Sequence, residues 1–409
     1  MRPRCGRRCW LECHPRRGAA TVNIYKRRVR LYTDVRDVLR PGTQGGDRVR
    51  KRRKAQANST DVARVAGVSI AAVSRAFSPD GSISTVLREK VYAAARKLNY
   101  VPNTLARSLI TRQTNIVALM LANMSNPIYA QILSEASRRL EDIGKQVLLF
   151  TPRDPDDFDR SLQHMLQYQV DAIVIAAASI SSQMATLCLG RGVPVVTLGR
   201  HIPGLPVHSI RGNAREGGER AAEMLLSGHG QHFGMVTGPA HLTTMIERKE
   251  GALARLSKAR VTVEACDGGL TYEGGRNAAL QLMRNVPRPD SLICMTDIMA
   301  LGAMDAVRHE LGLKIPDDVA VIGFDDIPEA GHASYQLTTI KTPVVEMVDY
   351  MIDLVSDRAT NAELAEIQIP AEVIVRGSTR AGDGAMGASV NSLGNRLKTP
   401  PKRVAKRRA

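Results

Sequence analysis

From residue 115 onward the chain alternates short apolar, β-branched runs with amphipathic stretches, and this alternation constrains its fold more than any other feature. A parallel sheet that is covered by helices on both faces requires continuous apolar strands of this kind. The sequence therefore predicts a doubly wound α/β body. The apolar runs are, in chain order, NIVALML, QVLLFT, DAIVIAA, PVVTLG, HFGMVTG, VTVEACD, SLICMTD and VAVIGFDD.

The length of this body predicts two lobes. Residues 115–380 are too many for one sheet of this type, and the alternation starts afresh after Gly228. We therefore expect two α/β lobes in tandem that face each other, with any ligand bound between them.

The net charge of +17 is unevenly distributed along the chain. It divides into +14 over residues 1–58, +5 over 59–114, −8 over 115–380 and +6 over 381–409. Basic runs outside periodic segments are typical of solvated, disordered tails. We expect a disordered N-terminal extension at 1–58 and a disordered tail at 381–409, so only the charge of 59–114 bears on a folded binding surface.

The first 14 residues contain a C-x3-C-x3-C-H cluster, residues 5–14, but adjacent ligands rarely share one tetrahedral ion, and we expect no metal and no cofactor. Three further cysteines, Cys188, Cys266 and Cys294, stand singly in apolar surroundings, which is typical of small core residues in a reducing compartment. Neither a signal peptide nor a membrane-spanning run is visible, which predicts a cytoplasmic protein with no membrane partner.

The stretch STDVARVAGVSIAAVSRAF, residues 59–77, has the signals of two short helices and a tight turn. Ser59 or Thr60 is expected to cap a helix over residues 61–66, which Gly67 ends in the left-handed conformation. Ser69 then caps a second helix that runs to about Phe77. The stretch therefore predicts a helix-turn-helix.

Small residues within this stretch fit the same interpretation. Ala63 is small because the second helix crosses close over the first, Gly67 because a Cβ would clash in the turn, and Val73 because it fills the gap between the helices. A third helix follows from Ser84, with apolar residues spaced to pack on the pair.

Several motifs, in order from about residue 59 to 380, closely resemble the LacI/GalR family of bacterial repressors. The resemblance implies an N-terminal DNA-reading headpiece at 59–101, a hinge helix and linker at 102–114, and a two-lobed effector and dimerisation domain at 115–380, shaped like a periplasmic sugar-binding protein. The motifs are TDVARVAGVSIAAVSRAF, REKVYAAARKLNYVPNTLARSL, SNPIYAQI, MTDIMALGAMDAVRHELGLKIPDDVAVIGFDD and LTTIKTP.

In such a headpiece the N-terminal part of the second helix faces base edges in the major groove. Arg75 is the expected base reader, because a guanidinium binds guanine O6 and N7 bidentately, while a phosphate contact or a solvated side chain is the alternative. The residues expected to face DNA on this helix are Ser69, Ile70, Ala71, Ser74 and Arg75.

The hinge is too short to be stable as an isolated helix, so we expect it to order only beside a second hinge on DNA. By resemblance, Leu109 is the leucine wedged into the minor groove at the centre of a palindromic operator, and Asn103 also contacts DNA. The alternative for Leu109 is an exposed leucine in a linker. Paired hinges predict a homodimer.

In the body, ligands of parallel sheets bind beyond the carboxyl ends of the strands. Asn126, Arg200, Asp297 and Asp325 each follow one of the apolar runs. The resemblance adds Arg248, three residues before Gly251, where family members carry the arginine that holds the effector. These five residues are expected to bind a sugar or a sugar acid, although a structural role remains the alternative for each of them, a salt bridge in the case of Arg248 and Asp325.

One position departs from the family. Where relatives usually have an Asp-Asn pair before the first helix of the second lobe, this chain reads RGNAREGG, with Gly212 in place of the Asp. If that acid holds a sugar hydroxyl elsewhere, the effector here is acidic or differently oriented.

Two other functions share parts of this pattern. A free binding protein has the same lobes but needs export, and here a headpiece stands in front of the body. A nucleotide-dependent oxidoreductase needs a glycine fingerprint between a strand and a helix, whereas GHGQHFG precedes a strand. We therefore expect a transcriptional regulator and no enzyme activity. No Met occurs between Met1 and Met120, and we hypothesise that translation of the native protein starts at Val49.

Overall fold

The computed structural model describes residues 57–78, 81–102, 113–121, 124–152, 157–176, 180–202, 204–356 and 364–381. The chain forms two compact units, which meet in sequence at Pro102 and Asn103. The N-terminal extension, most of the hinge and most of the C-terminal tail lie outside the described residues.

The first unit contains three helices, α1 (Ser59–Ala66), α2 (Ile70–Ala76) and α3 (Thr85–Lys97). The cap of α1 corrects the prediction: Asn58, rather than Ser59 or Thr60, accepts hydrogen bonds from the N–H groups of Thr60 and Asp61. The Asp61 carboxylate in turn accepts from the Asn58 N–H, which completes a capping box. The predicted cap of α2 is confirmed, since the Ser69 hydroxyl accepts from the Ala72 N–H at 3.2 Å.

The turn between α1 and α2 requires glycine for a different reason from the one predicted. Gly67 has φ +66° and ends α1 in the left-handed conformation, as expected. No neighbouring atom lies within 4 Å of the position of a Cβ there, so the requirement comes from the backbone conformation rather than from a clash with another segment. Ala63 and Val73 are both buried where α1, α2 and α3 meet, as the packing argument predicted.

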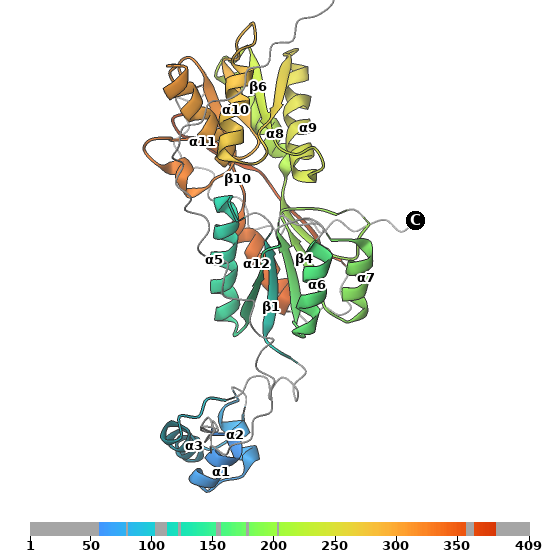
Figure 1. Ribbon diagram of the computed structural model, residues 1–409, viewed down its shortest axis with the longest axis vertical. Coiled ribbons are helices and arrows are strands. Elements are labelled where there is room, and N and C mark those ends of the chain that lie inside the picture. Colours follow the sequence, from blue (N-terminus) through green and yellow to red (C-terminus); the bar gives the residue numbers. More distant parts are fainter. Residues whose placement is uncertain are drawn as a thin grey trace, which may run out of the picture. The chain divides into compact units, whose positions relative to one another are not determined.

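The first lobe of the second unit is a six-stranded parallel sheet in the order β11-β5-β4-β3-β1-β2. Helices α5 and α12 cover one face of the sheet and α6 and α7 the other (Figure 1). The strands are β1 (Ile116–Leu121), β2 (Gln146–Phe150), β3 (Ala172–Ala176), β4 (Val195–Leu198), β5 (His208–Gly212) and β11 (Glu366–Ile369). The helices are α5 (Pro127–Asp142), α6 (Phe158–Gln167), α7 (Ser182–Gly190) and α12 (Val344–Ser356).

The second lobe repeats this topology, with the order β12-β10-β9-β8-β6-β7, and only β12 runs antiparallel to its neighbour. Its strands are β6 (Phe233–Thr237), β7 (Val263–Asp267), β8 (Ser291–Cys294), β9 (Ala320–Asp325), β10 (Thr338–Lys341) and β12 (Glu372–Ile374). Its helices are α8 (Ala214–Ser227), α9 (Thr243–Lys258), α10 (Tyr272–Leu282) and α11 (Asp297–Asp305), with a π-helical turn at Ala306–Glu310 and a 3-10 turn at Pro328–Gly331. Two doubly wound lobes confirm the predicted fold class.

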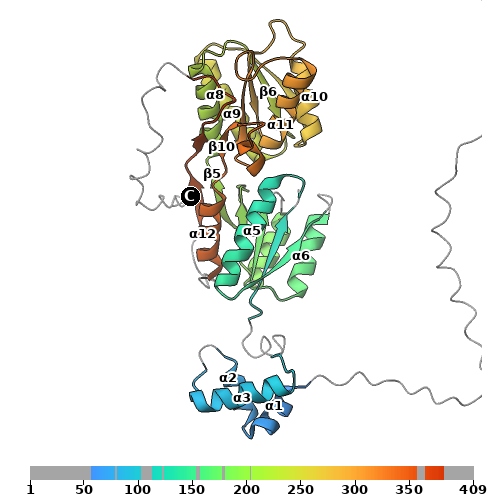
Figure 2. The ribbon, with the colours of Figure 1, turned by 90° about the vertical axis from the view of Figure 1, so that its left-hand side faces the viewer.

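The lobes are not simply consecutive, which corrects the tandem arrangement. The second lobe begins with α8 and not after Gly228, because α8 packs on α9 and on the second sheet. Within the described residues the chain crosses between the lobes after β5, after β10 and after β11. The second crossing returns the chain to the first lobe, where α12 lies beside α5 in both views (Figures 1 and 2).

Cys188 and Cys294 are buried, as predicted, and Cys266 is half-buried. Among the helices that the structure describes, none combines the length and the apolar character needed to cross a membrane.

Candidate functional site

Helix α2 presents one buried and one exposed face. Its buried residues, Ala72, Val73 and Ala76, pack in the core of the first unit. The five residues predicted to face DNA are all exposed, and Ile70 is 50 % exposed. The structure therefore brings Ser69, Ile70, Ala71, Ser74 and Arg75 to one accessible side of the helix-turn-helix. Asn103 and Leu109 lie outside the described residues.

A cleft in the second unit is lined by residues of both lobes and of all three crossings. It holds about 950 Å³ of empty space, part of which is open solvent. Four of the five predicted effector residues line it: Asn126, Arg200, Arg248 and Asp325.

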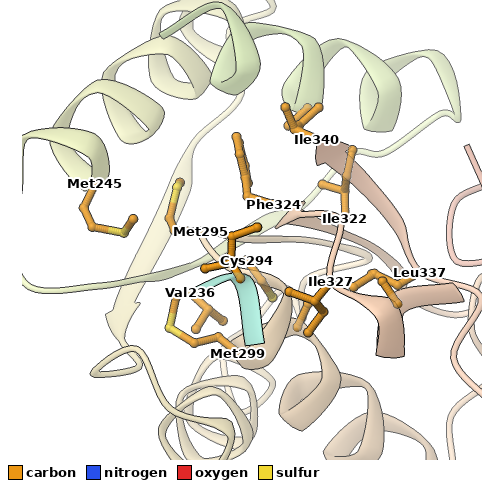
Figure 3. Close-up of a cluster of buried hydrophobic side chains, with 14 of the residues drawn as sticks. Val236, Met245, Cys294, Met295, Met299, Ile322, Phe324, Ile327, Leu337 and Ile340 are labelled. Carbon is orange, nitrogen blue, oxygen red and sulfur yellow. The ribbon is translucent and has the colours of Figure 1, made fainter. Parts of the chain in front are cut away.

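The centre of the cleft is an ion pair between Arg248 of α9 and Asp325 at the end of β9. Arg248 Nη2 donates to Asp325 Oδ1 at 2.9 Å, and the two side chains are only 9 % and 7 % exposed. Arg248 also donates from Nη1 to the carbonyl oxygen of Met295, and its guanidinium lies 4.6 Å from the centre of the Phe324 ring. Phe324 and Met295 belong to a buried apolar cluster (Figure 3). This packing holds the guanidinium rigidly, while its Nε has no protein partner among the described residues.

Polar side chains of the first lobe complete the cleft. Asn126 caps α5, accepting from the Ile128 N–H, and its amide nitrogen lies 3.5 Å from Asp325 Oδ2 in the other lobe. Arg200 follows β4, and burial lowers the pKa of its guanidinium. Burial likewise raises the pKa of the nearby Tyr129 hydroxyl.

Asp297 does not line the cleft, so the expectation that it contacts the effector is not supported by the geometry. Its carboxylate accepts from the Thr339 hydroxyl at 2.6 Å and from the Ile327 N–H at 3.0 Å, inside the second lobe. Complete burial raises the pKa of Asp297 well above its usual range, and the Asp325 charge raises it further. Asp297 therefore ties α11 to the segment that follows β9.

Thr296, the residue before Asp297, lines the cleft where Asp297 was expected. Thr296 caps α11, whereas Asp297, the first residue of that helix, is held inside the second lobe by its hydrogen bonds with Thr339 and Ile327. Sequence reasoning also missed Tyr129 and Thr244. Helical spacing could have found both, since Tyr129 lies three residues after Asn126 on α5 and Thr244 four residues before Arg248 on α9.

Direct contacts between the lobes surround the cleft. The Thr244 hydroxyl donates to the Gly199 carbonyl oxygen at 3.2 Å. At the edge, Arg211 Nη1 of β5 donates to both carboxylate oxygens of Glu247 on α9, at 2.8 and 2.9 Å. A ligand in the cleft would therefore act on groups that already hold the two lobes together.

An exposed helix-turn-helix and a two-lobed body with a polar cleft together define a DNA-binding regulator that responds to a small molecule. Comparison with known proteins supports this class. Residues 60–103 match the family of bacterial regulatory proteins named lacI, and residues 221–379 match the periplasmic binding protein-like domain.

The ribose operon repressor of Bacillus subtilis (strain 168) is 32% identical to this chain over 327 residues, covering 79% of this chain and 98% of the repressor. Among solved structures, the lac repressor dimer bound to operator and the anti-inducer ONPF has a TM-score of 0.69 at 26% identity, covering 80% of this chain and 99% of that one. The transcriptional regulator CelR in complex with cellobiose has a TM-score of 0.59 at 28% identity, with 79% and 99% covered.

The chain belongs to the LacI family of bacterial transcriptional regulators. It is a DNA-binding regulator and not an enzyme, as the sequence predicted.

Proposed function

We propose that this protein is a homodimeric repressor that binds a palindromic operator and changes its operator affinity when a sugar or a sugar acid binds between its lobes. The observation that carries the proposal is one chain with both an exposed recognition helix and a cleft in which buried polar groups of two lobes converge. Because it acts on DNA, we place it in the cytoplasm.

Operator reading is assigned to the exposed face of α2. Arg75 would bind a guanine edge, whereas Ile70 and Ala71 offer only apolar contact, for example to a thymine methyl group. Residues 59–101 form the headpiece, and the hinge at 102–114, with Asn103 and Leu109, would enter the minor groove. A single headpiece covers little DNA, which favours two copies on a palindrome.

Effector control is assigned to the cleft of residues 115–380. A ligand that bonds Asn126 and Arg200 in one lobe and Arg248 in the other favours the lobe orientation in which all three can reach it. The ligand shifts the population of that orientation only to the extent that it binds that orientation more tightly than the other. The hinge joins the first lobe alone, so the orientation of the lobes sets the distance between the paired hinges and hence the affinity for DNA.

The experiment identifies the bound promoter by footprinting and then measures operator affinity by fluorescence anisotropy with and without each member of a panel of sugars and sugar acids. We expect a palindromic footprint, a dimer by sedimentation, and at least one compound that changes the operator dissociation constant. A stable monomer with full operator affinity, or a panel without effect, would contradict the proposal.

A further inference from the structure

The charges that line the cleft do not balance. Three cationic side chains line it, Arg200, Arg248 and Lys341, but only one carboxylate among the described residues does, that of Asp325. Asp325 pairs with Arg248 at 2.9 Å, and Lys341 pairs with Glu372 at 3.2 Å. Within the described part of the chain no carboxylate forms an ion pair with Arg200, and the Tyr129 hydroxyl near it is neutral, because burial raises the pKa of that phenol.

Arg200 is nevertheless held in place. The Thr197 and Ser209 hydroxyls, from the adjacent strands β4 and β5, each donate to its carbonyl oxygen at 2.9 Å. The preceding residue, Gly199, has φ +78°, a conformation that favours glycine and turns the chain as it leaves β4. The backbone of Arg200 is thus fixed by two neighbouring strands at the carboxyl edge of the sheet.

At the same edge of the sheet, Gly212 stands where relatives of the family usually have an aspartate. Gly212 ends β5, the strand that pairs with β4, and it lines the cleft. A Cβ at this position would lie 3.2 Å from Pro343 Cδ of the second crossing, which leaves little room for a side chain. The first lobe therefore offers Arg200 no carboxylate from its neighbouring strand.

Arg200 is half-buried, and an unpaired charge that is partly withdrawn from water costs free energy unless a ligand supplies the opposite charge. We infer that the effector carries a single carboxylate that pairs with Arg200, while its hydroxyl groups bond to Asn126 and the Arg248–Asp325 pair. A planar carboxylate matches the fork of one guanidinium, and one free cation balances one negative charge. This inference rests on the proposed function and narrows its ligand class to monocarboxylic sugar acids.

The test uses the full-length protein and matched pairs of probes. These are D-gluconate with D-sorbitol, D-galacturonate with D-galactose, D-glucuronate with D-glucose and D-ribonate with D-ribose; D-glucose 6-phosphate and D-ribose 5-phosphate report on phosphate. Thermal shift finds the probes that bind, and calorimetry gives their dissociation constants. The variants are Arg200→Met and, as a matched control, Arg284→Met, which removes an exposed arginine after the end of α10.

We expect at least one carboxylate to bind more tightly than its neutral partner, and Arg200→Met to weaken it about 10- to 100-fold, as expected for the loss of a charged hydrogen bond. Arg284→Met should leave the affinity unchanged. Without a probe, Arg200→Met should melt no lower than the wild type, because it removes an unpaired cation from the cleft.

The inference is wrong if no carboxylate binds better than its neutral partner, if only the phosphates bind, or if Arg200→Met keeps the affinity. Operator affinity, measured on the same samples, separates this failure from that of the proposed function. A neutral sugar that changes operator affinity would leave the proposed function intact, whereas a panel in which neither class changes it would contradict both.

Discussion

Replacing Asp325 by alanine should separate effector response from operator binding, and the structure adds a second effect, on stability. The Asp325 carboxylate accepts from Arg248 at 2.9 Å and from the Thr342 hydroxyl at 3.1 Å, and the Asn126 amide lies 3.5 Å away. Asp325→Ala leaves the buried guanidinium of Arg248 without its counter-charge. Breaking a buried ion pair in this way costs about 3–5 kcal/mol of unfolding free energy.

Effector binding should suffer as well. Loss of a charged hydrogen bond costs about 1.5–3 kcal/mol, or roughly 10- to 100-fold in the effector dissociation constant. Operator affinity without effector should change little, because Asp325 belongs to the second lobe and the hinge joins only the first. Asp325→Asn, which keeps the shape and an acceptor oxygen, should lose effector affinity with a smaller loss of stability.

The assays are urea unfolding, calorimetric titration of an effector identified by the panel above, and operator anisotropy. Asp326→Ala is the matched control: its carboxylate pairs with Arg376 at 2.6 Å and does not line the cleft, so it should lower stability alone. Full effector affinity in a folded Asp325→Ala variant would refute the reasoning and make this aspartate purely structural.

Three further predictions concern other parts of the chain. Arg75→Ala should lose operator discrimination at one base position by about 1–3 kcal/mol and keep effector affinity, as competition anisotropy with single-base operator variants would measure; a uniform loss across all sequences would indicate a phosphate contact instead. Glu247→Gln should weaken the contact with Arg211 that joins the lobes and alter the fold-change in operator affinity caused by effector, and an unchanged fold-change would show that this pair plays no part in coupling. His208 is buried, which lowers its pKa, and its Nδ1 accepts a hydrogen bond from the Ala365 N–H. The unfolded chain therefore binds a proton at His208 more readily than the folded chain does. The contribution of neutral His208 to the unfolding free energy is fully present above the unfolded pKa of about 6.5, and it is lost as the pH falls below that value, by up to about 1.4 kcal/mol per pH unit. Urea unfolding between pH 7.5 and 5.5 should show that loss in the wild type and less of it in His208→Asn, and equal slopes would contradict it.

The local elements could be predicted from the sequence because their determinants lie within a few residues of each other. Gly67 and Ser69 specify the turn and the start of α2 through backbone conformation and one side-chain cap, and both predictions were confirmed. The eight apolar runs likewise predicted eight of the twelve described strands, β1–β4 and β6–β9, whereas β5, β10, β11 and β12 have no such run. Even here a neighbour competed: Asn58 takes the cap position because Asp61 completes the reciprocal bond.

The site depended on contacts between segments that are far apart in the chain. Asp297 and Thr296 are adjacent, and only the packing of Thr339 and Ile327 against Asp297 decides which of the two faces the cleft. The ion pair between Arg248 and Asp325, which the sequence left open as an alternative to ligand contact, joins residues 77 positions apart.

Local sequence determined that this chain has a helix-turn-helix and two largely parallel sheets, because side-chain periodicity and helix caps depend on residues within one or two turns of each other. The tertiary structure decided how the lobes are joined. Three crossings bring Gly212, Lys341 and Ala371 to one cleft. The side-chain periodicity of a segment predicts whether it is a helix or a strand, but it does not predict which lobe the segment joins. The tertiary structure also decided whether Arg200 has a charged partner, because that depends on every segment that packs around its side chain.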